Sequence, residues 1–227
     1  MLKFYYNAAP NPMKVALFLE EAGLAYEPIP LDTRKGDQHL PGYLAINPNA
    51  KAPAIVDDGI TVFDSNAILL YLAEKSGRFL PGDAADRGSL LSWLMFVATG
   101  VGPYSGQSVH FKHFAPDGLD YAVNRYDFEA QRHYDILDQR LMENRYMLGD
   151  EYTIVDMAVW GWARMVPRVL NDQAMDKLPS LKRLLDELNA RPAAALALAL
   201  PAQHEFKTDM DAQAERAMFP QNERLKA

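Results

Sequence analysis

The sequence predicts two domains, an α/β domain at the N-terminus and an all-helical domain after it. Residues 1–80 alternate between short apolar runs bounded by turn residues, which predict strands, and runs with apolar residues at helical spacing. A Pro-Gly stretch at 81–83 predicts a linker. Residues 84–202 carry helical spacing alone, and residues 203–227 form a mostly polar tail for which we expect little fixed structure.

The first half of the α/β domain predicts a βαβ unit. An apolar strand over Leu2–Tyr6 is followed by a loop and a helix over Met13–Ala22, with Pro12 in the first helical turn and Gly23 after the end. A second strand over Tyr26–Leu31 completes the unit.

The second half adds two short strands and a helix. After a weakly helical piece around Tyr43, strands are predicted at Ala54–Val56 and Ile60–Phe63, joined by an Asp-Asp-Gly turn. An amphipathic helix follows over Ser65–Ser76. The resulting order, β-α-β-α-β-β-α, is that of a thioredoxin-like domain.

The second domain is predicted to consist of helices. Apolar residues recur at helical spacing in four runs: 85–101, 121–143, 153–166 and 181–190. Thr153 and Asp156 form a capping box ahead of the third run, for which we expect a structural role. Three glycines and Pro103 predict a break in the helix between Gly100 and Pro116.

Composition limits the possible functions. The formal net charge of −7 argues against general nucleic-acid binding, which requires clustered Lys and Arg. No apolar run is long enough to span a membrane and no secretory signal precedes the first strand, so we expect a soluble, cytoplasmic protein. The count of zero cysteines means that any thiol chemistry must use the thiol of a bound small molecule.

The runs NPNAKAPAIVDDG and FDSNAILLYLAEK resemble the glutathione-binding signature of cytosolic glutathione transferases. The resemblance implies a cis peptide bond between Ala52 and Pro53, with the Ala52 backbone pairing with the cysteinyl part of glutathione. It also implies that Ser65, at a helix N-terminus, holds the γ-glutamyl carboxylate while Asp64 accepts from the ammonium group. The alternative is that Asp64 and Ser65 only cap the helix.

The stretch YYNAAPNPMKVALFLEEAGLAYE resembles a narrower group, the Nu class of bacterial transferases and the related fungal nitrogen-regulator proteins. That group has a Thr-Pro-Asn run near the glutathione sulfur, and this chain has Ala9 in place of the Thr. The resemblance implies that the Asn11 amide stabilises the thiolate, although Asn-Pro is also an ordinary turn pair. Tyr6 is the reserve candidate, unless its hydroxyl is bonded in the core.

Two further residues match Nu-class positions that contact glutathione. Gln38 corresponds to a residue that binds the glycyl end, and its alternative role is that of a surface glutamine. Arg125 corresponds to an arginine that reaches the bound tripeptide, whose two carboxylates suit a guanidinium fork. Its alternative role is an ion pair with Glu129 four residues later.

The run Gly100–Pro116 resembles the Nu-class segment that lines the pocket for the electrophile or disulfide. The expected lining residues are Tyr104, Gln107, His110 and Phe111. A metal site at His110 and His113 lacks an evident third ligand, so we expect no metal.

The resemblance implies an enzyme that uses glutathione as co-substrate to reduce disulfides, with weak conjugating activity. One alternative is a transferase that conjugates glutathione to an electrophile or cleaves an ether. Another is a regulatory protein that binds glutathione with little turnover. The resemblance also implies a homodimer.

Overall fold

The computed structural model describes residues 1–226, which fall into two compact units. The first unit contains residues 1–71 together with the segment from Leu196 onward, and the second contains Leu72–Ala195. This division falls before the stretch at 81–83 where the sequence predicts a linker. The C-terminal segment, from Leu196 onward, belongs to the first unit together with residues 1–71.

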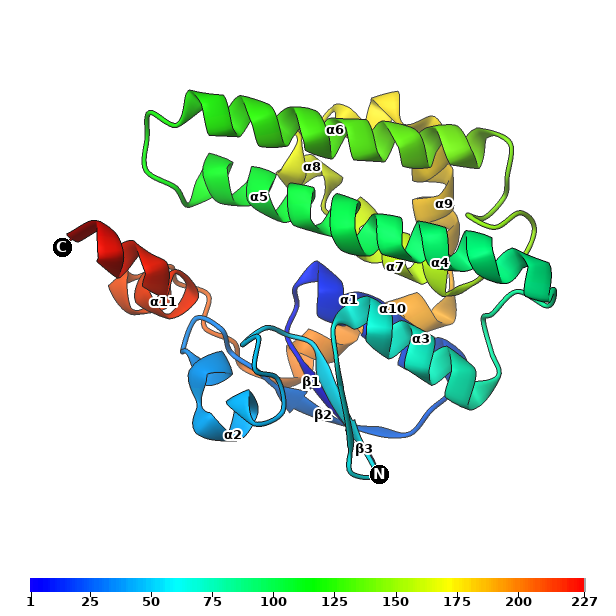
Figure 1. Ribbon diagram of the computed structural model, residues 1–227, viewed down its shortest axis with the longest axis horizontal. Helices are drawn as coiled ribbons and strands as arrows, with labels where there is room; N and C mark the ends of the chain where they lie inside the picture. Colours follow the sequence, from blue (N-terminus) through cyan, green and yellow to red (C-terminus); the bar gives the residue numbers. More distant parts are fainter. Residues whose placement is uncertain (227) are drawn as a thin grey trace. The chain divides into compact units, whose positions relative to one another are not determined.

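The first unit is built on a four-stranded sheet with the order β2-β1-β3-β4 (Figure 1). Strand β1 is parallel to β2 and antiparallel to β3, and β3 is antiparallel to β4. The strands are β1 (Leu2–Tyr6), β2 (Tyr26–Pro30), β3 (Ala54–Asp57) and β4 (Ile60–Phe63).

Helices follow the strands in the predicted order, which confirms the β-α-β-α-β-β-α arrangement. They are α1 (Pro10–Ala22), α2 (Pro41–Leu44), α3 (Ser65–Ser76, which continues into the second unit) and α11 (Ala212–Met218). Short 3-10 turns lie at Asp37–His39, Leu200–Gln203 and Pro220–Lys226. Every residue of α1 from Pro12 to Leu19 is buried, so this helix forms the centre of the unit.

The polar tail is ordered against the first unit, so the expectation of little fixed structure is wrong. The Lys207 backbone N–H donates to Asp32 at 2.6 Å, and the Arg34 guanidinium donates to the Lys207 carbonyl at 2.9 Å. Asp211 caps α11 by accepting from two backbone N–H groups of the first helical turn. Composition alone did not predict this order because the bonds of Lys207 to Asp32 and Arg34 join residues far apart in sequence.

The second unit is helical, as predicted. Its helices are α4 (Arg87–Phe96), α5 (Gly102–His113), α6 (Asp120–Met142), α7 (Ile154–Ala163), α8 (Val166–Val169), α9 (Pro179–Asn189) and α10 (Pro192–Ala199, whose end reaches the first unit). A π-helical segment at Val97–Val101 joins α4 to α5, and 3-10 turns lie at Ala84–Asp86 and Ala174–Lys177. Helices α5 and α6 run side by side (Figure 1).

Helix α7 is the core of this unit, since all ten of its residues are buried. Its predicted capping box is present. The Thr153 hydroxyl accepts from the Val155 N–H at 3.3 Å, and the Asp156 carboxylate accepts from the Thr153 N–H at 2.9 Å. Asp156 also accepts from the Met147 N–H at 2.7 Å, so the box joins α7 to the preceding loop.

The predicted helix break between Gly100 and Pro116 is wrong. The chain continues from α4 into α5 through the π-helical segment, whose wider turn directly precedes Pro103, a residue that lacks an N–H. The glycines serve close packing instead. A Cβ atom on Gly100 would lie 2.4 Å from the His133 ring, and one on Gly102 would lie 3.2 Å from the Trp162 indole.

Candidate functional site

The strand register brings three loops of the first unit to one end of the sheet. Ala54, the first residue of β3, lies opposite Tyr5 on β1 and Phe63 on β4. The chain therefore leaves β1, enters β3 and leaves β4 at neighbouring points. Helix α1 begins shortly after β1 and α3 begins at Ser65, so two helix N-termini lie at this end. Helix N-termini favour anionic groups because their first N–H groups have no partner within the helix.

Asn11 lies in the first turn of α1 and is half-buried. Pro10 and Pro12 on either side carry no amide hydrogen, and Ala9 at the N-cap makes no side-chain cap bond. The N–H groups in this turn therefore come from Asn11, through its backbone and its side-chain amide. A donor of this kind stabilises a thiolate relative to a thiol and lowers the thiol pKa.

The peptide bond between Ala52 and Pro53 is cis, as expected. The paired segment of β3 begins at Ala54, so Ala52 lies outside the ladder, and the preceding loop is braced from within. The Tyr43 hydroxyl donates to the Lys51 carbonyl at 2.6 Å, and the side-chain amide of the buried Asn47 donates to it at 2.7 Å. These bonds fix the backbone on which the peptide part of a ligand would pair.

Asp64 and Ser65 form the entry to α3. Asp64 has a left-handed backbone (φ 68°), and its Oδ1 accepts from the N–H groups of Asn66 at 2.9 Å and Ala67 at 3.1 Å. This oxygen of Asp64 therefore caps α3, which is the alternative role considered from the sequence. Asp64 is nevertheless exposed at the surface and Ser65 is buried beside it, so a ligand role in addition to the cap is compatible with the geometry.

Tyr6 has a structural role. Its buried hydroxyl donates to the Leu200 carbonyl at 3.1 Å and lies 2.7 Å from the His204 Nδ1. Burial raises the pKa of Tyr6 to about 12, which keeps the phenol protonated. The reserve candidate for thiolate stabilisation is therefore a core tyrosine that anchors the C-terminal segment.

Gln38 also bonds within the protein. It is 4% exposed, and its Nε2 donates to the Ala217 carbonyl at 2.9 Å and to the Thr33 carbonyl at 3.2 Å. Its Oε1 is buried without a hydrogen-bond partner among the described residues. The side chain thus ties the short 3-10 turn at Asp37–His39 to α11, and this geometry favours a structural role over contact with a ligand.

Four predicted pocket residues lie on α5 in the second unit, where Tyr104, His110 and Phe111 are half-buried and Gln107 is exposed. The Phe111 ring stacks on Tyr126 of α6 with centroids 5.2 Å apart, and the Tyr104 ring lies 6.3 Å from the same tyrosine. Burial lowers the pKa of His110, which favours its neutral form near pH 7. The three rings provide an aromatic surface along α5 and α6.

Arg125 forms the ion pair that the sequence offered as an alternative role. Its guanidinium lies 3.1 Å from the Glu129 carboxylate, which Arg132 also contacts at 2.9 Å. The bond from Arg132, together with the charges of both arginines, holds the pKa of the Glu129 carboxyl below its usual value. About half of the Arg125 side chain remains exposed (52%), so the pairing leaves room for further contacts.

Two buried polar residues of the first unit, Lys14 and Asn66, were not predicted from the sequence. Lys14 is buried in α1 one turn after Asn11, and its Nζ donates to the Asn66 Oδ1 at 3.0 Å. The sequence feature that could have indicated a buried lysine is the position of Lys14 as the single charged residue within the apolar run Met13–Leu19. All residues of this run are buried.

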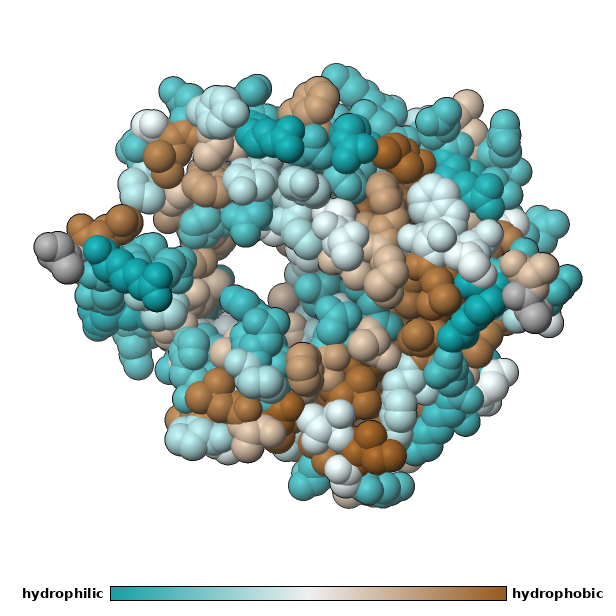
Figure 2. All heavy atoms as spheres, viewed as in Figure 1, coloured by the Kyte–Doolittle hydropathy of each residue, from teal (hydrophilic) through white to brown (hydrophobic). Residues whose placement is uncertain are grey.

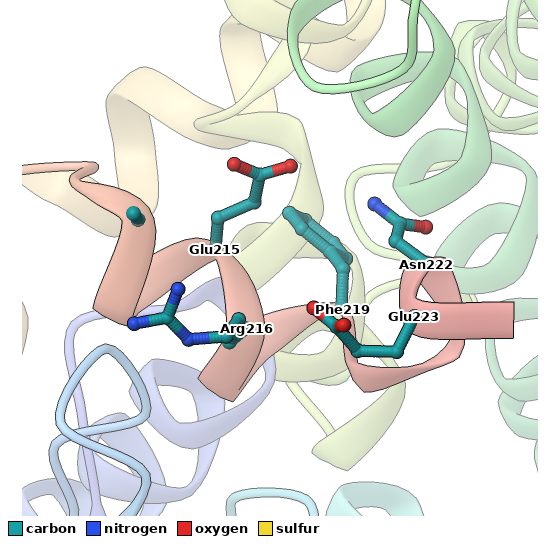
Figure 3. Close-up of a pocket in the computed structure, with 6 residues that line it drawn as sticks. Glu215, Arg216, Phe219, Asn222 and Glu223 are labelled. Atoms are coloured by element: carbon teal, nitrogen blue, oxygen red, sulfur yellow. The ribbon is translucent and has the colours of Figure 1, made fainter. Parts of the chain in front are cut away.

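A hollow of about 70 Å³ lies on the C-terminal segment, lined by residues of α11 and the following 3-10 turn. Figure 3 shows Glu215 and Asn222 on either side of the Phe219 ring. None of the predicted site residues lines it, so we assign it no part in the site. Among residues 1–226, no group of three His, Cys, Asp or Glu is placed to hold a metal ion. In the same residues, no helix has the length and apolar character needed to span a membrane.

Two family descriptions match the chain. "Glutathione S-transferase, N-terminal domain" matches residues 2–74, and "Glutathione S-transferase, C-terminal domain" matches residues 121–192. A curated relative, disulfide-bond oxidoreductase YfcG of Escherichia coli, is 43% identical over 205 residues, which are 87% of this chain and 94% of YfcG.

Solved structures are also similar. A glutathione transferase from Burkholderia graminis, with two glutathione molecules bound per subunit, shares 37% identity and a TM-score of 0.83, covering 89% of each chain. One from Pseudomonas putida, with one glutathione disulfide bound per subunit, shares 38% identity and a TM-score of 0.82, covering 88% of this chain and 91% of that one. The protein is therefore a member of the glutathione S-transferase family.

Proposed function

We propose that the protein binds glutathione at the described end of the sheet and uses its thiolate to reduce small disulfides. The observation that carries this proposal is the register of β1, β3 and β4, which gathers Asn11, the cis Ala52–Pro53 bond and Ser65 at that end. The relative named as a disulfide-bond oxidoreductase and the glutathione-bound neighbours support it.

Each residue has a distinct task in this proposal. The Ala52 backbone pairs with the cysteinyl part of the tripeptide, and Pro53 fixes that edge. Ser65 and the N-terminus of α3 hold the γ-glutamyl carboxylate, while Asp64 accepts from the ammonium. Asn11 stabilises the thiolate. Gln38 and Tyr6 are left out because the Gln38 amide nitrogen and the Tyr6 hydroxyl are bonded within the protein.

The reaction needs no cysteine of the protein. The glutathione thiolate attacks one sulfur of the substrate disulfide, which forms a mixed disulfide and releases the other sulfur as a thiolate that takes up a proton. A second glutathione thiolate attacks the mixed disulfide and gives glutathione disulfide and the second thiol. The protein contributes a lowered thiol pKa and the alignment of the reacting sulfurs.

Conjugation to an electrophile is the second candidate, and the aromatic surface of Tyr104, Phe111 and Tyr126 favours it. Half-buried aromatic rings provide apolar contact area that suits an aryl substrate. In this case the same thiolate would attack carbon instead of sulfur, and the substrate would be set by the residues along α5 and α6. His110 and Gln107 are the polar groups proposed to lie near that substrate, and Arg125 remains a proposed contact of glutathione.

A side-by-side assay distinguishes the candidates. Turnover of hydroxyethyl disulfide and of an aryl halide is measured with glutathione under identical conditions. Disulfide turnover well above conjugation supports disulfide reduction as the function. Conjugation well above disulfide turnover supports the second candidate instead. Measurable glutathione binding without turnover of either substrate would indicate the regulatory alternative.

A homodimer and a cytoplasmic location are further parts of this proposal. Leu91 and Met95 lie one turn apart on α4 and are 37% and 44% exposed. Figure 2 shows apolar surface over α4, and an exposed apolar patch of this kind suits contact with a second copy of the chain. Light scattering of the purified protein should give about twice the chain mass of 25.5 kDa.

A further inference from the structure

Lys14 is an unusual residue for the centre of a helix core. Its side chain is 1% exposed, and its neighbours Met13 and Val15 on α1 are also buried. Lysine is almost never fully buried unless its charge is compensated, because the ammonium loses its hydration. A buried lysine three residues after Asn11 therefore requires a hydrogen-bond partner for its ammonium.

That partner lies at the start of α3. The Lys14 Nζ donates to the Oδ1 of Asn66 at 3.0 Å, and Asn66 is 2% exposed. Asn66 directly follows Ser65, the residue proposed to hold the γ-glutamyl carboxylate. The contact thus connects the helix that carries Asn11 with the helix turn that is proposed to hold the γ-glutamyl carboxylate.

Asn66 is neutral and leaves the ammonium charge largely uncompensated. Burial lowers the pKa of Lys14 to about 7, and the charge of Asp64 works in the opposite direction. A buried amine in this range is only partly protonated near neutral pH, so one added negative charge nearby is enough to change its protonation.

Other charged groups of the surrounding elements have their own partners or lie at the surface. On α1, Glu20 accepts from the Tyr26 hydroxyl at 2.7 Å, and Glu21 lies in the last helical turn. On the sheet, Asp57 accepts from the Tyr71 hydroxyl at 2.8 Å, and Lys3 is exposed. The tyrosines of β1 are Tyr5 and the bonded Tyr6. Asp64 is accordingly the charged group that acts on Lys14.

We propose that Lys14 is a positioning residue for the γ-glutamyl carboxylate of the bound tripeptide. Its ammonium, held against Asn66 under the first turn of α3, attracts the carboxylate at Ser65, and the charge of the ligand in turn draws a proton onto Lys14. Binding of glutathione is thereby coupled to proton uptake. This inference rests on the proposed function, since it requires the γ-glutamyl carboxylate to bind at Ser65.

Calorimetric titration with S-hexylglutathione tests the coupling, because its blocked sulfur cannot release a proton. The apparent binding enthalpy is measured slightly above neutral pH in two buffers of different ionisation enthalpy, and the difference gives the number of protons taken up. We expect a clear net uptake, below about one proton, for the wild-type protein. Lys14→Met should show no uptake and bind about tenfold more weakly, the equivalent of one pKa unit.

Lys14→Arg and Lys3→Met are the matched controls. An arginine stays charged at all accessible pH values, so Lys14→Arg should bind within about threefold of wild type and show no linked uptake. Lys3→Met removes an exposed lysine of the same unit and should change neither quantity.

The outcomes separate the two proposals. If S-hexylglutathione fails to bind the wild-type protein, the proposed function is overturned. If it binds without proton uptake, or if Lys14→Met retains both affinity and uptake, the role of Lys14 is overturned and the proposed function stands. The wild-type titration decides the question even if Lys14→Met does not fold.

Discussion

The side-chain amide of Gln38 donates to the main-chain carbonyl of Ala217 at 2.9 Å, joining residues 179 positions apart in the chain. Because this nitrogen is bonded within the protein, Gln38→Ala should lower the free energy of unfolding by about 1–2 kcal/mol. Glutathione affinity should stay within about twofold of wild type. Chemical denaturation and calorimetric titration of the same preparation measure both quantities.

His39 provides the control for this prediction. Its Nε2 lies 2.9 Å from the same Ala217 carbonyl, so His39→Ala should also reduce stability without changing affinity. A tenfold loss of glutathione affinity in Gln38→Ala at unchanged stability would instead restore the ligand role that the sequence predicts.

Tyr6→Phe should affect stability and not turnover. It removes the hydroxyl bonded to Leu200 and His204, at a cost of about 1–2 kcal/mol. Burial raises the pKa of Tyr6 to about 12 from an ordinary value of 10.0, so the unfolded chain loses this proton at lower pH than the native protein. The contribution of Tyr6 is therefore complete below pH 10 and is lost as pH rises toward 12.

Denaturation at a series of alkaline pH values checks the sign of this effect. The stability difference between wild type and Tyr6→Phe should shrink as pH increases through that window. Loss of glutathione-dependent turnover at neutral pH, with stability unchanged, would show that the hydroxyl takes part in the chemistry.

Gly100→Ala should destabilise the protein through overpacking. The new Cβ would lie 2.4 Å from the His133 Nε2, and that ring is fixed by a 2.6 Å contact from Nδ1 to the Glu129 carbonyl and by stacking on Phe96. Forcing an extra methyl group into such a core costs about 1–3 kcal/mol. Thermal unfolding measures the effect.

Gly88 is the matched control for Gly100. It lies in α4, and a Cβ built on it meets no atom within 4 Å. Gly88→Ala should therefore stabilise the protein by about 0.5–1 kcal/mol through helix propensity. Equal effects of the two substitutions would contradict the packing explanation.

The strands and most helices could be predicted from the sequence because their signals are local. Strand β3 begins directly after Pro53 and an Asp-Asp-Gly turn joins it to β4, and the predicted strand Ile60–Phe63 matches the structure. Thr153 and Asp156 form their capping box within four residues of chain. Such short-range patterns remain informative without knowledge of the tertiary fold.

The misses have a common cause, which is dependence on distant partners. Gly100 is a helix breaker by local rules, but its purpose is to admit the ring of His133 from α6. Gln38 is polar and near a turn, which is typical of a surface residue. It is nevertheless buried, and its amide donates to a carbonyl of the C-terminal helix α11. Lys14 donates a hydrogen bond to Asn66, which lies 52 positions away. Periodicity and turn chemistry contain no information on such pairs.

Activation of the glutathione sulfur by Asn11 is tested most directly by the pKa of the glutathione thiol when bound to the protein, measured from the ultraviolet absorbance of the thiolate. We expect a value clearly below that of free glutathione in wild type. In Asn11→Ala it should rise by about one unit, corresponding to about 1.4 kcal/mol of lost thiolate stabilisation. A bound thiol that titrates like free glutathione, or an unchanged value in Asn11→Ala, would contradict the assignment of Asn11 as the group that activates the sulfur.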